Sequence, residues 1–131
     1  MLFRSNFESQ RRNRIGICLA ARAGSLATDV DYWNGRNRPG GPSPTLFAYT
    51  LPSAAIGEIA IRFKLTGPNL CFVGGDESIL SEAAYFIRQG EADAVVCVKV
   101  TVVSTALEQI ISTKPTATAE AHFLKREEDQ G

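Results

Sequence analysis

Hydrophobic residues in this chain fall into short runs that alternate between strand-like and helix-like patterns. Four runs have the continuous or alternating apolar pattern of β-strands, at 15–20, 70–73, 94–103 and 117–124. Between them, the segments 52–64 and 76–89 carry apolar residues three and four positions apart, the spacing of one helix face. Strands that alternate with helices predict a layered α/β fold with a mostly parallel sheet.

The same patterns predict how deeply each segment is buried. The strands at 15–20 and 70–73 are almost purely apolar, so we expect both to be buried. The helix at 52–64 gains a wide apolar face from Ile61 and is predicted to be mostly buried. The strand at 117–124 alternates small or apolar residues with polar ones, as a half-buried strand does.

Turn and capping residues set the predicted ends of these elements. Thr28 or Asp29 is predicted to cap a short helix that runs through Trp33. Residues 34–44 are rich in glycine and proline and are predicted to form a loop. Gly67-Pro68 and Gly90 are predicted to end the two longer helical segments, and the apolar patch at 107–111 fits either a helix or a strand.

The segment after the strand at 70–73 offers the first candidate chemistry. A strand that turns tightly into a helix is where many α/β enzymes hold a nucleophile. Here the turn reads Gly74-Gly75-Asp76, with neither cysteine nor serine at its tip. Gly74-Gly75 could cradle a phosphate, but Asp76 and Glu77 would repel it, so helix capping is the preferred interpretation and general acid–base work the weaker one.

Composition excludes several functional classes. The chain has 131 residues, 44% of them hydrophobic, with 14 basic and 14 acidic residues. A balanced charge provides no field for nucleic acid or an anionic membrane surface. The apolar runs are too short to span a membrane. We predict a lead-in at 1–14, one domain at 15–126 and a solvated tail at 127–131.

Cysteine and histidine usage gives no metal or disulfide pattern. Cys18, Cys71 and Cys97 lie far apart inside apolar runs, which predicts buried reduced thiols and a cytoplasmic setting. Cys71 lies within its strand, where a thiol has a raised pKa and is inert. His122 is the single histidine and is predicted to be exposed or half-buried, so neither a metal nor a cofactor is expected.

Aromatic residues after the glycine- and proline-rich loop form a candidate pocket. Phe47 and Tyr49 precede Pro52, and together they could line an apolar pocket or a partner surface. Core packing explains these residues equally well.

Two motifs give the chain a family resemblance. Residues 51–69 combine a proline-initiated helix with Leu65-Thr66-Gly67-Pro68, and Gly90-Glu91-Ala92-Asp93 precedes the next apolar strand. Residues 117–126 then follow as an alternating strand. This pattern resembles the N-terminal domain of the β-ketoacyl synthase family, within the thiolase-like superfamily. The resemblance implies half of a thiolase-like fold.

The departures from the family pattern concern its chemistry. Family members carry the acyl-accepting cysteine in the turn before the second helix, a position that falls here on Asp76. Their two catalytic histidines, or a histidine and an asparagine, belong to a second half that these residues do not match. The resemblance therefore implies a short form without the nucleophile.

The resemblance also implies partners. The family dimerises along the strand equivalent to Leu70, Cys71, Phe72 and Val73. We therefore expect a homodimer, or a heterodimer with a ketosynthase, and an acyl carrier protein as a further partner in fatty-acid or polyketide assembly. The implied role is a non-catalytic one similar to that of a chain length factor. A homodimeric interaction module without acyl chemistry, and an acyltransferase that uses Asp76, Cys71 or His122, remain the alternatives.

Overall fold

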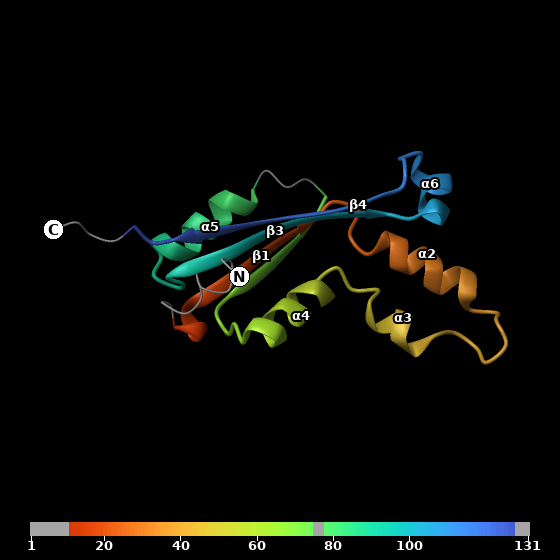
Figure 1. Cartoon of the computed structure of the whole chain (residues 1–131), viewed down its shortest axis with the longest axis horizontal. Helices are drawn as coiled ribbons and strands as arrows, with labels where there is room; N and C mark the ends of the chain where they lie inside the picture. Colours follow the sequence, from red (N-terminus) through yellow and green to blue (C-terminus); the bar gives the residue numbers. More distant parts are fainter. Residues whose placement is uncertain (1–10, 75–77, 128–131) are drawn as a thin grey trace.

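The computed structural model describes residues 11–74 and 78–127 of the chain. Within them, four strands form one sheet in the order β2-β1-β3-β4 (Figure 1). The strands are β1 (Ile15–Ala21), β2 (Asn69–Val73), β3 (Ala94–Val103) and β4 (Thr116–Lys125). β1 pairs in parallel with both β2 and β3, and β4 pairs antiparallel with β3. The prediction of an α/β fold with a mostly parallel sheet is confirmed.

Helices lie on both faces of this sheet and at one end of it. In Figure 1, α5 lies above the sheet and α4 below it, while α2, α3 and α6 lie beyond the carboxyl ends of β1 and β3. The helical elements are a short 3₁₀ turn at Arg12–Arg14, α2 (Leu26–Gly35), α3 (Pro44–Ala48), α4 (Ala54–Phe63), α5 (Ile79–Arg88) and α6 (Thr105–Ile111).

The core is divided into two layers by the alternation of side chains along β1. Ile15, Ile17 and Leu19 pack on the α4 side together with Ile56 of that helix. Cys18 and Ala20 point the other way and pack against α5. Because successive side chains of a strand point to opposite faces, every residue of β1 is buried, as predicted for a central strand.

The starts and ends of the helices differ in part from the predictions. α2 begins at Leu26, so Thr28 and Asp29 lie inside the helix and do not cap it. The cap position belongs to Ser25, whose hydroxyl makes no capping hydrogen bond and lies 2.8 Å from the carbonyl oxygen of Thr50 and 3.2 Å from both carboxylate oxygens of Asp29. α4 ends at Lys64, which adopts the left-handed conformation, three residues before Gly67.

The remaining elements clarify the ambiguous segments. The patch at 107–111 belongs to α6, which begins where the Ser104 hydroxyl accepts a hydrogen bond from the Leu107 amide. Gly90 follows α5 at a φ of 76°, which confirms its predicted role as a helix stop. α5 is described from Ile79 onward, and the predicted start at Asp76 and Glu77 lies outside the described residues.

Three predictions of burial were wrong. The strand at 117–124 was predicted to be half-buried, yet residues 117–122 of β4 are all exposed. β2 is an edge strand whose residues are half-buried or exposed, and Val73 is 63% exposed. α4 buries Ile56 alone, while Ile61 is 81% exposed. β2 and α4 both carry apolar side chains on faces that the described fold leaves uncovered. These side chains are therefore suited to contacts with residues beyond those described.

Two glycines allow the start of β1 to approach the segment before β2. A Cβ atom on Gly67 would lie 2.4 Å from the backbone oxygen of Ile15, and one on Gly16 would lie 2.6 Å from the backbone oxygen of Pro68. The close approach is fixed by hydrogen bonds from the Gly67 amide to Ile15 and from the Ile17 amide to Pro68. The Gly67-Pro68 motif therefore has a packing role.

We predict that Gly67→Ala destabilises the chain by roughly 2 kcal/mol or more, because the added methyl meets backbone atoms that cannot rotate away. Gly57→Ala is the matched control. Gly57 lies inside α4 with nothing near its missing Cβ, so alanine there should stabilise by about 0.5–1 kcal/mol. Urea unfolding followed by circular dichroism measures both. Equal effects of the two substitutions would contradict the packing argument.

An ion pair ties the start of β1 to the start of β3. The Arg14 guanidinium donates to the Asp93 carboxylate at 3.1 and 3.3 Å and to the carbonyl of Gly90 at 2.6 Å. The Asp93 amide in turn donates to the carbonyl of Arg14. The hydrogen bond from Arg14 holds the pKa of Asp93 below its ordinary value of 3.8. The Gly90-Glu91-Ala92-Asp93 motif thus helps to hold the start of β3 against the start of β1.

Because this pKa is lower in the folded chain than in the unfolded one, the pair stabilises the fold above the ordinary carboxyl pKa and ceases to do so as the pH falls through the folded-state value. We predict that Asp93→Asn lowers the melting temperature at pH 7 by a small amount, since the pair is partly exposed. The difference from the unsubstituted chain should vanish in acid below the folded-state pKa. A difference that is constant with pH would show that the carboxylate charge has no part in it.

Candidate functional site

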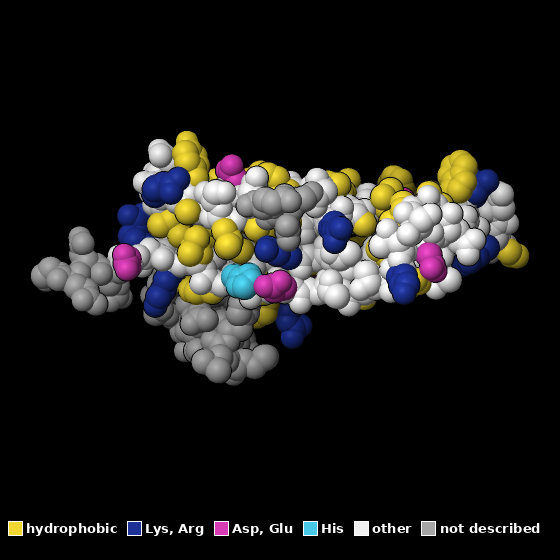
Figure 2. All heavy atoms as spheres, turned by 90° about the horizontal axis from the view of Figure 1, so that it is seen from above, with side chains coloured by type: hydrophobic (Ala, Val, Ile, Leu, Met, Phe, Trp, Pro, Cys, Tyr) yellow, Lys and Arg dark blue, Asp and Glu magenta, His cyan; other side chains and the backbone are white. Residues whose placement is uncertain are grey.

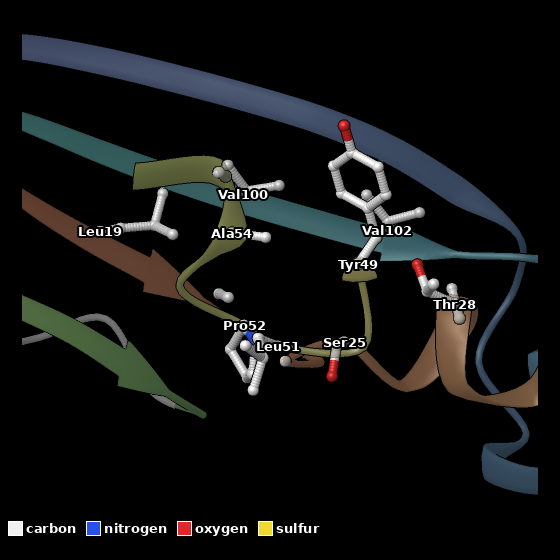
Figure 3. A pocket seen from close by; sticks show the side chains of 13 residues that line it. Leu19, Ser25, Thr28, Tyr49, Leu51, Pro52, Ala54, Val100 and Val102 are labelled. Carbon is white, nitrogen blue, oxygen red and sulfur yellow. The ribbon is translucent and has the colours of Figure 1, made fainter. Parts of the chain in front are cut away.

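A pocket of about 170 Å³ opens at the carboxyl ends of β1 and β3, on the face of the sheet that α4 covers (Figure 3). In open α/β sheets, ligands bind at this end of the strands. Its lining comes from β1, β3, the first turn of α2 and the segment that joins α3 to α4. The residues are Leu19, Ala21, Gly24, Ser25, Ala27, Thr28, Tyr49, Leu51, Pro52, Ala54, Ala55, Val100 and Val102.

Local structure explains how distant segments meet at this pocket. Val100 and Val102 are two residues apart on β3 and therefore point to the same face of the sheet. Gly24 has a φ of 57° and lies close to Pro52, which lets the chain turn sharply after β1. The Ser25 hydroxyl and the Thr50 carbonyl then hold the two loops together.

The chemistry of the pocket suits binding more than catalysis. Aliphatic side chains form most of the wall, and the hydroxyl groups of Ser25, Thr28 and Tyr49 supply its polar atoms. The Tyr49 hydroxyl donates to the Glu58 carboxylate, and this hydrogen bond raises the pKa of Tyr49. Among the described residues, the lining contains no carboxylate, histidine or thiol, so none of these side chains can act as a strong base or a thiolate at neutral pH.

Of the three residues predicted to line a pocket, two lie at this one and the third lies elsewhere. Tyr49 and Pro52 line it. Phe47 is exposed and packs against Tyr32, with ring centroids 5.5 Å apart, beside a different hollow formed with Pro42 and Pro44. The sequence analysis missed Leu19, Val100 and Val102, although the β-strand patterns of their segments had already placed alternate residues on common faces.

Gly74, the first residue after β2, lies next to this pocket. Gly74 has a φ of 101°, and its amide donates to the carbonyl of Ala21, a pocket residue, at 3.2 Å. Gly75 and Asp76 lie outside the described residues. By sequence, no cysteine occurs between Gly74 and Ser78.

The outer edge of β2 is open among the described residues, since β1 is its one partner strand there. The Pro68 carbonyl and the Gly74 amide both bond to β1. Because backbone groups alternate in direction along a strand, the amides of Asn69, Cys71 and Val73 face away from β1. This edge can accept another strand.

The three cysteines are free thiols with suppressed reactivity. Burial raises the pKa of Cys18 to about 12 and that of Cys97 to about 11. Burial also raises the pKa of Cys71, which is half-buried on β2. This direction agrees with the prediction that Cys71 is inert, because the thiolate is the nucleophilic form.

His122 lies on β4, away from the pocket lining. It is exposed, and its Nε2 atom lies 2.6 Å from the Glu120 carboxylate (Figure 2). Over residues 11–74 and 78–127, no three histidine, cysteine or acidic side chains gather closely enough to bind a metal ion. In that same part of the chain, no helix has the length and apolarity needed to cross a bilayer.

The comparisons with known proteins agree with this geometry. Residues 4–122 match the family model "Beta-ketoacyl synthase, N-terminal domain". The comparison with curated proteins gave no match.

Solved structures with the same fold come from ketosynthase systems. One is the ishigamide ketosynthase/chain length factor, with 21% identity and a TM-score of 0.75 over 87% of this chain. A second is the ketosynthase ApeO in complex with its chain length factor ApeC from Xenorhabdus doucetiae, with 21% identity and a TM-score of 0.74 over 95%. A third is AntDE:AntF, a type II polyketide ketosynthase with its acyl-carrier protein, with 17% identity and a TM-score of 0.69 over 91%.

The 131 residues span 36%, 54% and 41% of the lengths of these three solved chains. The likeness therefore concerns a part of each neighbour and establishes the fold.

We predict that iodoacetamide at pH 8 leaves Cys18 and Cys97 unmodified in the folded chain and labels Cys71 slowly, since all three thiols hold their protons more tightly than a free thiol does. All three should react after unfolding in guanidinium, which is the control. Mass spectrometry of the digested chain assigns each adduct. Fast native labelling of Cys71 would contradict the inert assignment.

Proposed function

Because the chain belongs to the β-ketoacyl synthase family through its N-terminal domain, we propose that it acts as a chain-length-factor-like subunit in polyketide or fatty-acid assembly. The observation that carries this proposal is the turn after β2. In a chain that matches the family over residues 4–122, this turn reads Gly74-Gly75-Asp76 and offers no thiol to accept an acyl group. A ketosynthase-like scaffold without that thiol supports binding and shaping of an acyl chain and not its condensation.

The pocket supports the binding part of this role. An acyl chain is apolar along its length, and Leu19, Val100 and Val102 offer it an aliphatic wall. The hydroxyl of Thr28 lies in the same lining and can donate to a carbonyl oxygen of a growing polyketide, whereas the Ser25 hydroxyl already donates to the Thr50 carbonyl. Gly74, which precedes the segment that corresponds to the family's nucleophile, is connected to this pocket through its hydrogen bond to Ala21.

The open edge of β2 supports pairing with a ketosynthase. Three amides on this edge face away from β1, and Val73 is largely exposed there. A partner strand would satisfy the backbone groups and cover part of this apolar surface. Solved neighbours that combine a ketosynthase with a chain length factor, or with an acyl-carrier protein, support these two classes of partner.

Two other functions use the same features. A homodimeric interaction module would also pair through the β2 edge, because a second copy can supply the partner strand. An acyltransferase that uses Asp76, Cys71 or His122 fits less well, since the Cys71 pKa is raised and the described position of His122 is outside the pocket. The free thiols of all three cysteines support a reducing, cytoplasmic setting for any of these roles.

The test is co-expression with a ketosynthase from the same organism, followed by intact mass analysis after incubation with an octanoyl thioester. We expect a stable complex in which the acyl group is found on the ketosynthase and not on this chain. Cys71→Pro should weaken the complex at least tenfold, because proline removes an amide that faces the partner. Cys71→Ser keeps that amide and is the matched control.

Three results would overturn the proposal. One is an acyl adduct on this chain, which would favour the acyltransferase. Another is a homodimer that excludes the ketosynthase, which would favour the interaction module. The third is equal binding by the proline and serine variants, which would place the interface away from β2.

A further inference from the structure

A second cavity lies on the opposite face of the sheet from the pocket described above. It measures about 270 Å³ and is bounded by the end of β1 and start of α2, the end of β3, α6 and the start of β4. Figure 1 shows these elements together at the carboxyl end of β3, with α6 on the same side of the sheet as α5. The lining residues are Arg22, Ala23, Leu26, Thr101, Val103, Ile111, Thr113 and Thr116.

The two cavities are separated by β3 itself. Val100 and Val102 point into the first, while Thr101 and Val103, the alternate residues of the same strand, point into the second. No lining residue is shared. The second cavity is thus an independent site, and it can bind a ligand different from that of the first.

Its lining combines an apolar floor with a single cation. Val103 is 4% exposed at the floor, and Leu26 and Ile111 form apolar sides. The threonine side chains supply three hydroxyl groups, and among the described residues Arg22 supplies the one charge of the lining. In the part of the chain that the structure describes, no carboxylate forms an ion pair with the Arg22 guanidinium, which is solvent-exposed.

We propose that this cavity binds a carboxylate with a medium-length aliphatic tail. The tail would cover Leu26, Val103 and Ile111, and the carboxylate would accept hydrogen bonds from Arg22 and from a neighbouring threonine. A phosphate ligand fits less well, because it carries more charge than one arginine neutralises and has no apolar part to fill the floor. A free acid is also distinct from an acyl thioester, which lacks the anion that Arg22 recognises.

The test titrates octanoate, with octanol as the uncharged probe, into the chain and follows its methyl groups by NMR. We expect octanoate to shift the methyl signals of Leu26, Val103 and Ile111 and to leave those of Leu51 and Val102, in the first pocket, unchanged. Octanol should bind at the same methyls but at least tenfold more weakly, the loss expected for one charge-assisted hydrogen bond. This measurement uses the unsubstituted chain and needs no ketosynthase, so it stands or fails apart from the proposed function.

Two variants with matched controls sharpen the assignment. Arg22→Gln should weaken octanoate binding at least tenfold and leave octanol binding unchanged, while Arg62→Gln, on the exposed side of α4, should change neither. Leu26→Trp should fill the cavity and abolish binding of both probes, while Leu51→Trp, in the first pocket, should not.

Any of three results would overturn the proposal. These are the absence of shifts at millimolar octanoate, equal octanoate affinity in Arg22→Gln, and shifts that appear in the first pocket instead of the second. Circular dichroism of each variant separates loss of binding from loss of folding.

Discussion

The structure depends on the complete enclosure of β1. This strand is hydrogen-bonded on both edges, to β2 and β3, and all of its side chains are buried. Enclosing β1 requires the segment before β2 to pass close to the start of β1. Gly16 and Gly67 leave room for this close approach of the two backbones. Enclosure also requires an anchor, which the Arg14–Asp93 pair provides. The residues that follow the end of β1 line both cavities. The geometry of each cavity therefore depends on how β1 is held in the sheet.

Sequence patterns predicted which segments form helices and strands better than they predicted how deeply each segment is buried. The continuous apolar run of β1 and the β-branched run of β3 indicated strands correctly, because few other structures accommodate them. The same reasoning assigned a buried environment to β2 and to Ile61, and both are substantially exposed. The hydropathy of a segment indicates that the segment is suited to burial. It does not show which neighbour covers the segment, and here the described residues cover β2 in part and leave Ile61 exposed.

The candidate pocket shows a similar division. Tyr49 and Pro52 were found because they follow a loop rich in glycine and proline, and such loops often border ligand sites. Phe47 belongs to the same segment, but α3 turns it toward Tyr32. Val100 and Val102 reach the pocket through the register between β1 and β3, which no local pattern specifies. The start of α2 was also missed, since no capping hydrogen bond from the Ser25 side chain marks it.

The residues that stabilise this fold are largely distinct from those that it offers to partners and ligands. Ile15, Ile17 and Val96 form the core, whereas Val73 and Ile61 contribute little to it because most of their surface remains in solvent. Substitutions at the exposed positions should therefore act on association and not on folding. The sheet can persist while the outer edge of β2 is unpaired, since β1 is enclosed without help from that edge. Pairing along this edge, as proposed, would therefore draw its binding free energy from these exposed apolar side chains.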